Sequence, residues 1–108
     1  MTVNAVCESI GLKALSIADG EREIEGVYAG DLLSWVMGHA KCSQALVTIM
    51  SNINVLAVAS LLDLSCVILA ESAECDNGFI EAAKVKGINI LSSSLSTYEL
   101  CAKLSGML

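Results

Sequence analysis

The most constraining feature of the chain is a set of three continuous apolar runs, each followed by a segment of helical character. The runs cover residues 45–49, 65–70 and 88–92, so they recur at a spacing of about 21 residues. This alternation is typical of parallel strands joined by right-handed helical crossovers. Because the runs are continuous rather than alternating, both faces of the sheet must be covered. The sequence therefore predicts an α/β three-layer sandwich with a mainly parallel sheet of about five strands.

Local signals predict where the other elements lie. Asp31 resembles the N-cap of a helix, Ser96 and Glu99 have the spacing of a capping box, and Gly11 and Gly87 are suited to end helices. We expect no linker and no boundary between domains within the chain, so residues 1–108 form a single domain. The expected elements are helices over residues 2–10, 32–40, 52–64, 76–87 and 96–108, with two additional strands over 12–17 and 23–28.

Composition limits the partners of the chain. Hydrophobic residues make up 55% of its 108 residues, which is more than a small monomer can bury, so we expect a homodimer. Six basic residues against twelve acidic ones give a net charge of −6, which argues against a nucleic-acid partner. The longest apolar run, residues 53–62, is far shorter than the roughly 20 residues that span a membrane. We therefore expect no membrane partner.

The cysteines indicate the compartment. There are five, at positions 7, 42, 66, 75 and 101, and no two lie closer than nine positions apart. An odd, widely spaced set without a CxxC motif is typical of a reduced compartment rather than of a disulfide framework or an iron–sulfur site. The first residues also lack the basic region and cleavage site of a secretory signal. We expect a cytoplasmic protein.

Polar loops follow the three apolar runs. In open parallel sheets, ligands bind beyond the carboxyl ends of the strands, where loops and helix N-termini meet. Main-chain N–H groups there, with hydroxyl and amide side chains, suit an anionic or nucleotide-like ligand. The alternative is that serine and asparagine serve only as helix caps. The predicted ligand-binding residues are Asp31, Ser51, Asn52, Asn54, Glu71, Ser93 and Ser94.

Residues 30–42 hold the only tryptophan and the only histidine of the chain. Asp31, Trp35 and His39 are spaced four apart, so they share one helical face. One interpretation makes His39 an acid–base or metal group. The other has Trp35 packing against the sheet or a partner, with His39 at a helix C-terminus, where it complements the helix dipole. A zinc site needs three or four ligands, and one histidine with Cys42 is too few, so we favour packing and expect no metal site.

Signatures of the common enzyme classes are missing from the sequence. There is no G-x-S-x-G and no second histidine for a hydrolytic triad. There is also no phosphate-binding loop and no G-x-G-x-x-G after a strand, so neither ATP chemistry nor a nicotinamide cofactor is indicated. Acidic pairs such as Glu21/Glu23 and Glu71/Glu74 lie in polar turns, where a solvated surface is the simpler explanation. We therefore predict no catalytic residues and no cofactor.

Three stretches carry a resemblance to a known family. GVYAGDLLSWVMGHA, NINVLAVASLLDLSCVILAE and GINILSSSLSTYELCAKL together resemble the small stand-alone DRTGG-domain proteins, which are similar to the N-terminal domain of HPr kinase/phosphorylase. The resemblance implies an α/β domain with a regulatory or ligand-sensing role, often in an oligomer. In the two-domain kinases, phosphoryl transfer belongs to the other domain, so kinase activity is not implied here.

The chain departs from the motif that names this family. Ser51-Asn52-Ile53 stands where the family has Asp-Arg-Thr, and Ala70-Glu71-Ser72 stands at about the position of Thr-Gly-Gly. The arginine and both glycines are missing, so the ligand of this chain need not be that of other members. We predict a non-catalytic regulatory or small-ligand-sensing module. Some short relatives lie beside genes for iron-only hydrogenase, so the alternative is a structural adaptor or accessory protein of such a redox complex.

Overall fold

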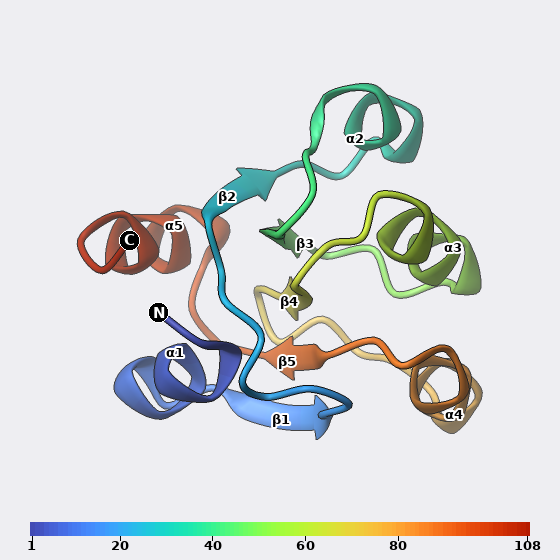
Figure 1. Ribbon diagram of the computed structural model, residues 1–108, viewed down its shortest axis with the longest axis horizontal. Coiled ribbons are helices and arrows are strands. Elements are labelled where there is room, and N and C mark those ends of the chain that lie inside the picture. Colours follow the sequence, from blue (N-terminus) through green and yellow to red (C-terminus); the bar gives the residue numbers. More distant parts are fainter.

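The computed structural model describes residues 1–108 and contains all the predicted helices and strands (Figure 1). The chain alternates between the two kinds of element along most of its length. In chain order they are α1 (Val3–Ile10), β1 (Lys13–Ser16), β2 (Gly26–Ala29), α2 (Leu33–His39), β3 (Gln44–Thr48), α3 (Ile53–Leu61), β4 (Cys66–Leu69), α4 (Asn77–Lys86), β5 (Ile90–Ser92) and α5 (Thr97–Ser105).

The five strands form one sheet in the order β1-β5-β4-β3-β2. Strands β2 to β5 are parallel, with Ala45 beside Cys66 and Val67 beside Ile90. The predicted parallel arrangement of the three apolar runs is confirmed. Strand β1 is antiparallel to β5 and pairs Lys13 with Ser92. The amino end of β1 therefore lies at the edge of the sheet where the parallel strands end.

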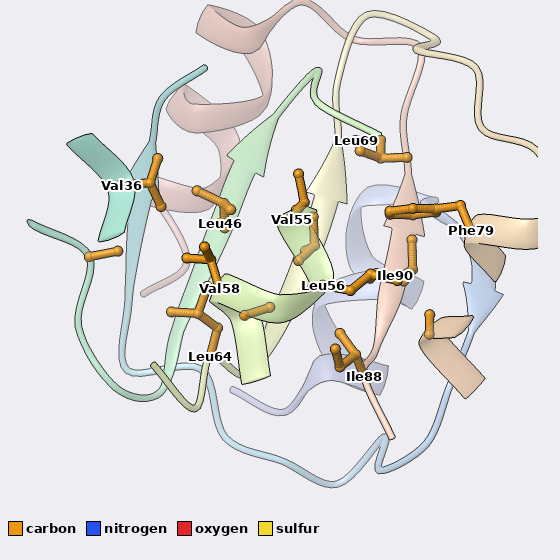
Figure 2. Packing of buried hydrophobic residues seen from close by; sticks show 14 residues of the cluster. Val36, Leu46, Val55, Leu56, Val58, Leu64, Leu69, Phe79, Ile88 and Ile90 are labelled. Carbon is orange, nitrogen blue, oxygen red and sulfur yellow. The ribbon is translucent and has the colours of Figure 1, made fainter. Parts of the chain in front are cut away.

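The sheet is covered on both faces, as the continuous apolar runs predicted. Helices α2, α3 and α4 lie on one face, and α1 and α5 lie on the other (Figure 1). Successive residues of each strand alternate between the two faces, so Leu46 and Val67 pack toward the first group of helices, and Val47 and Ile68 toward the second. Figure 2 shows the first core, in which Leu46, Leu69 and Ile90 of the sheet meet side chains of the helices.

Helix ends follow the local signals in most cases. Gly11 and Gly87 end α1 and α4 in the left-handed conformation, with φ of 76° and 71°, where a side chain would be strained. Ser96 and Glu99 form the predicted capping box at the start of α5. The predicted strand over residues 23–28 is shorter in the structure, because Glu23 bridges to Thr2 and only residues from Gly26 pair with β3. No helix is long and apolar enough to span a bilayer.

A buried asparagine holds the segment after β1 in place. Asn89, which is 4% exposed, precedes β5 and points its amide into the turn at Ala18 and Asp19. Its Oδ1 accepts hydrogen bonds from both main-chain N–H groups, at 2.8 and 3.0 Å. Its Nδ2 donates to the carbonyl oxygens of Asp19 and Ser65. Four hydrogen bonds from one side chain thus fix β1 against the parallel part of the sheet.

Candidate functional site

The loops after β4 and β5 separate at the carboxyl edge of the sheet. The chain leaves β4 toward α4 on one face and leaves β5 toward α5 on the other (Figure 1). A crevice between such loops is where open α/β sheets bind their ligands. Two main-chain hydrogen bonds join the loops here, from Glu71 N to Leu95 O at 2.8 Å and from Ser72 N to Ser93 O at 2.9 Å. The two loops are therefore joined to each other at this edge of the sheet.

A cavity of about 470 Å³ opens beside these loops, on the face of the sheet that carries α1 and α5. Its volume lies in the range of about 300–1,000 Å³ that is usual for small-molecule sites. Serine and lysine residues make up most of its lining, and Ile10 and Leu95 supply the apolar part. We call it the serine–lysine cavity, after the residues Lys13, Ser72, Ser92, Ser93, Ser94 and Lys103 that line it.

The two lysines reach the cavity from different elements. Lys13 begins β1 and is brought beside Ser92 by the antiparallel pairing with β5. Lys103 lies in the last turn of α5. Neither ammonium group has a carboxylate within 4 Å, since the ion pairs of the protein are Met1–Glu23, Arg22–Asp63 and Lys84–Glu81. Both lysines therefore line the cavity without forming an ion pair, in a chain whose net charge is −6.

Ser93 adds a hydrogen-bond donor to the cavity. It is only 8% exposed, and its Oγ accepts a hydrogen bond from the N–H of Leu95 at 3.0 Å. A hydroxyl group can also donate one hydrogen bond, and the proton of Ser93 has no acceptor in the protein. The group is therefore available to donate to an oxygen atom of a ligand.

The backbone at Glu71 and Ser72 has the left-handed conformation, with φ of 61° and 54°. Non-glycine residues rarely adopt it, because Cβ then approaches the carbonyl oxygen. Observed outliers of this kind gather at binding sites, where the surrounding structure holds them.

Glu71→Gly is expected to raise the free energy of unfolding by about 0.5–1 kcal/mol, since relief of the left-handed strain exceeds the entropic cost of glycine. Chemical denaturation measures the change. Glu74→Gly is the matched control, because Glu74 is an exposed residue of the same loop without positive φ. It should lower stability slightly. Equal effects of the two substitutions would contradict strain at Glu71.

The structure distributes the predicted ligand-binding residues over several places. Ser93 and Ser94 line the serine–lysine cavity, whereas Ser51 and Asn52 line a second cavity of about 400 Å³ between the starts of α3 and α4. Asn52 caps α3 through its Oδ1, and Ser51 donates to the carbonyl oxygen of Glu74 at 2.7 Å. The capping interpretation thus accounts for Asn52. Three predicted residues, Asp31, Asn54 and Glu71, line neither cavity.

The prediction that Asp31 caps α2 is wrong. The N-cap is Leu32, which has no side-chain cap. The Asp31 carboxylate turns instead toward the end of β3, where one oxygen accepts hydrogen bonds from Thr48 Oγ1 at 2.8 Å and from the N–H of Ile49 at 2.9 Å. These donors compete with the first turn of α2 for the same side chain. Asp31 therefore ties the loop after β2 to the loop after β3.

Trp35 does not pack against the sheet, contrary to one part of the prediction. It is 58% exposed and stacks on His39, with ring centroids 4.2 Å apart. His39 is the last residue of α2, as expected, and its Nδ1 lies 2.8 Å from the carbonyl oxygen of Trp35. That nitrogen must carry a proton to donate to the carbonyl. The ring pair is thus an exposed aromatic surface on α2.

The cysteines are all free thiols, and none of them lines the cavity. Cys66 is fully buried in β4, as predicted for a small hydrophobic residue, and burial raises the pKa of its thiol to about 12. Cys42 is exposed, with its Sγ 3.6 Å from Asp63 Oδ2. Nowhere do three His, Cys, Asp or Glu side chains come together in a geometry that holds a metal ion.

Sequence reasoning missed the two lysines, although it found Ser93 and Ser94. Lys13 begins a predicted strand, and only the antiparallel direction of that strand brings it to the carboxyl edge of β5. The sequence carries no local signal that links these residues, because Lys13 lies 79 positions before Ser92 and Lys103 lies nine positions after Ser94.

Comparison with known proteins agrees with this fold. No curated protein sequence matches the chain. The fold resembles the crystal structure of the CBS and DRTGG domains of the regulatory region of Clostridium perfringens pyrophosphatase, complexed with activator, diadenosine tetraphosphate. The TM-score is 0.72 at 12% sequence identity, over 94% of this chain and 44% of that one. The chain thus spans less than half the length of that structure. The model of the family described as HPr Serine kinase N terminus matches residues 48–108, and the chain belongs to that family.

Proposed function

We propose that the protein is a non-catalytic regulatory module that senses a small anionic or nucleotide-like ligand in the serine–lysine cavity. One observation supports the proposal: Lys13 and Lys103, which form no ion pair, line the same cavity as Ser93, whose hydroxyl donates no hydrogen bond within the protein. The solved structure of similar fold belongs to a regulatory region that was crystallised with an anionic activator. A sensing role for this chain is consistent with that likeness.

The chemistry of the cavity favours binding over catalysis. Serine hydroxyls need a neighbouring base to become nucleophiles, and no histidine or carboxylate lines the cavity. Lysine side chains attract anions as point charges. A ligand held there contacts β1, the loop after β5 and α5 together. Binding would therefore shift the population toward the arrangement in which these three elements are closed on the ligand.

A panel of small phosphates, nucleotides and carboxylates should contain at least one compound that raises the melting temperature of the protein. A ligand present at 100 times its Kd adds about 2.7 kcal/mol to stability by mass action. The double variant Lys13→Ala/Lys103→Ala should lose this increase. Lys84→Ala/Lys86→Ala removes the same charge from α4, outside the cavity, and should keep it. If no compound raised the melting temperature, or if both variants responded alike, the proposal would be wrong.

We also propose that the protein is a homodimer in the cytoplasm and that α2 contributes to the subunit contact. Leu32, Trp35 and Met37 are 64%, 58% and 47% exposed, which is unusual for such large apolar side chains close together in sequence. The five free thiols fit a reducing compartment. The same surface would serve the adaptor role that remains the second candidate, with a different protein as partner.

Trp35→Ala is expected to weaken self-association by at least tenfold in sedimentation experiments, because large aromatic side chains dominate contact energies. The far-UV spectrum should not change, since the side chain is mostly exposed and makes no contact with the core. The control is Val85→Ala, which truncates an 87% exposed side chain on α4. A dimer that is unaffected by Trp35→Ala, or a protein that is monomeric from the start, would contradict the subunit contact.

A further inference from the structure

We infer that Trp35 of one copy of the chain binds in an apolar groove at the β2 edge of a second copy, and that the partner's Trp35 binds the groove of the first copy in the same way. The inference rests on the proposed homodimer and names what the α2 surface contacts in it. It is carried by the lining of the groove, by the position of the groove relative to α2, and by the area that a stable dimer needs.

The groove has a volume of about 360 Å³ and lies between strand β2 and the end of α5. Strand β2 is the last strand of the sheet, so it pairs only with β3. Five of the six lining residues are hydrophobic, whereas hydrophobic residues are a minority in each of the other cavities. The lining consists of Val27, Ala29, Cys101, Leu104, Ser105 and Leu108. Such a lining suits an aromatic side chain, and the groove has room for one indole ring.

The exposed apolar surface of α2 lies at the same edge of the sheet but on the opposite face. Strand β2 leads into α2, and Figure 1 shows α2 on one side of β2 and α5 on the other. Leu32 and Trp35 are exposed there, while Val36 of the same helix is fully buried. A two-fold axis at this edge, parallel to the strands, would place α2 of each copy beside the groove of the other. A second copy is therefore the occupant that this surface fits.

The small size of α2 makes a contact between the two α2 helices alone insufficient. The helix has seven residues and is therefore only about 10 Å long. A stable dimer usually buries about 800 Å² on each partner, and one aromatic side chain supplies only about 150–250 Å² of that area. The reciprocal arrangement adds the groove and the edge of β2 to the contact. It also closes after two copies, since both grooves and both Trp35 side chains are then occupied.

Single substitutions remove one half of the contact each. Trp35→Ala removes the aromatic side chain and leaves the groove intact, whereas Ala29→Glu puts a charge in the groove and leaves Trp35 intact. Leu108→Glu introduces the charge from the α5 side, so a defect in the strand cannot explain a shared effect. Each variant should dimerise at least tenfold more weakly in sedimentation experiments, because a few buried contacts carry most of the binding energy. Ala14→Glu, the control, adds the same charge to an exposed alanine of the opposite edge strand β1 and should leave the dimer unchanged.

A mixture of two of these variants tests the reciprocal arrangement. In a mixed dimer, Trp35 of the Ala29→Glu chain can bind the intact groove of the Trp35→Ala chain, so one of the two contacts is restored. The mixed dimer should form at least fivefold more tightly than the dimer of either variant. Trp35 is the only tryptophan of the sequence, so the fluorescence of the mixture comes from that one indole. Its emission should shift to shorter wavelength as the Trp35→Ala chain is added.

The outcomes separate the inference from the proposed homodimer. If the unmodified chain dimerised but the groove variants and Ala14→Glu behaved alike, or if the mixture associated no better than its components, the inference would be overturned and the homodimer would stand. A contact through α2 itself would then be indicated. Polymers larger than a dimer would also overturn the inference, because open-ended pairing leaves the reciprocal contact unclosed. A chain that stays monomeric would contradict the homodimer and the inference together.

Discussion

Asn89→Ala is expected to lower the free energy of unfolding by about 3 kcal/mol, because each buried polar group that loses its partner costs about 1–3 kcal/mol. The substitution would leave three groups of the turn, the N–H groups of Ala18 and Asp19 and the carbonyl oxygen of Asp19, without the Asn89 amide. The carbonyl oxygen of Ser65 would lose a partner as well. Urea denaturation at equilibrium measures the effect, as a lower midpoint with an unchanged slope.

The same substitution should also weaken ligand binding. Asn89 holds the turn that follows β1, and the position of β1 places Lys13 in the serine–lysine cavity. Asn54→Ala is the matched control, since Asn54 is an exposed asparagine whose side chain makes no hydrogen bond that the fold needs. It should change stability by less than about 0.5 kcal/mol. A loss of under 1 kcal/mol for Asn89→Ala would contradict the role of this amide.

Leu46→Ala is expected to lower the free energy of unfolding by about 3 kcal/mol, within the range of about 2–5 kcal/mol for such truncations in a core. Leu46 lies in β3, is fully buried and packs near Val36 of α2 and Val58 of α3 (Figure 2). The cavity left behind would be enclosed by sheet and helices that cannot easily close it. Thermal and urea denaturation should both report the loss.

Leu61→Ala provides the comparison for Leu46→Ala. It removes the same atoms from a side chain that is 73% exposed at the end of α3. The expected change in stability is below about 0.5 kcal/mol. If the two leucine variants were equally stable, the three-layer arrangement around β3 would be wrong.

The parallel part of the fold could be predicted because its signals are local. A continuous apolar run such as residues 65–70 indicates a strand covered on both faces. When a helix connects two parallel strands, the crossover is almost always right-handed. The capping box at Ser96 and the left-handed glycines at Gly11 and Gly87 likewise depend on neighbours within a few residues. These features needed no knowledge of distant contacts.

The rest of the structure depends on contacts between residues far apart in sequence. The direction of β1 is fixed by pairing with β5 and by the Asn89 amide, which lies about 70 residues from the turn that it holds. Asp31 had the right residue type and position for a cap, but donors 17 and 18 residues away bind its carboxylate instead. Local sequence signals do not show which of several possible donors a side chain will bind.

Only some residues of the candidate site could be predicted, because the others reach it through contacts between distant parts of the chain. Ser93 and Ser94 follow a strand and so could be assigned to the carboxyl edge of the sheet. Lys13 reaches that edge because β1 runs antiparallel to β5. Lys103 reaches the cavity because α5 lies on the same face of the sheet as α1. The predicted single pocket is divided in the structure, since the loops after β3 and β5 open into different cavities.

The most direct test of the proposed site is a ¹⁵N NMR titration of the full chain with methyl phosphate. The proposal predicts that amide shifts change most at residues 11–13, at Ser92 to Leu95 and around Lys103, and that they saturate with one dissociation constant. Changes concentrated instead at residues 51–53 and 76–79 would assign binding to the second cavity between α3 and α4. That result, or changes scattered over the surface without saturation, would contradict an anion site in the serine–lysine cavity.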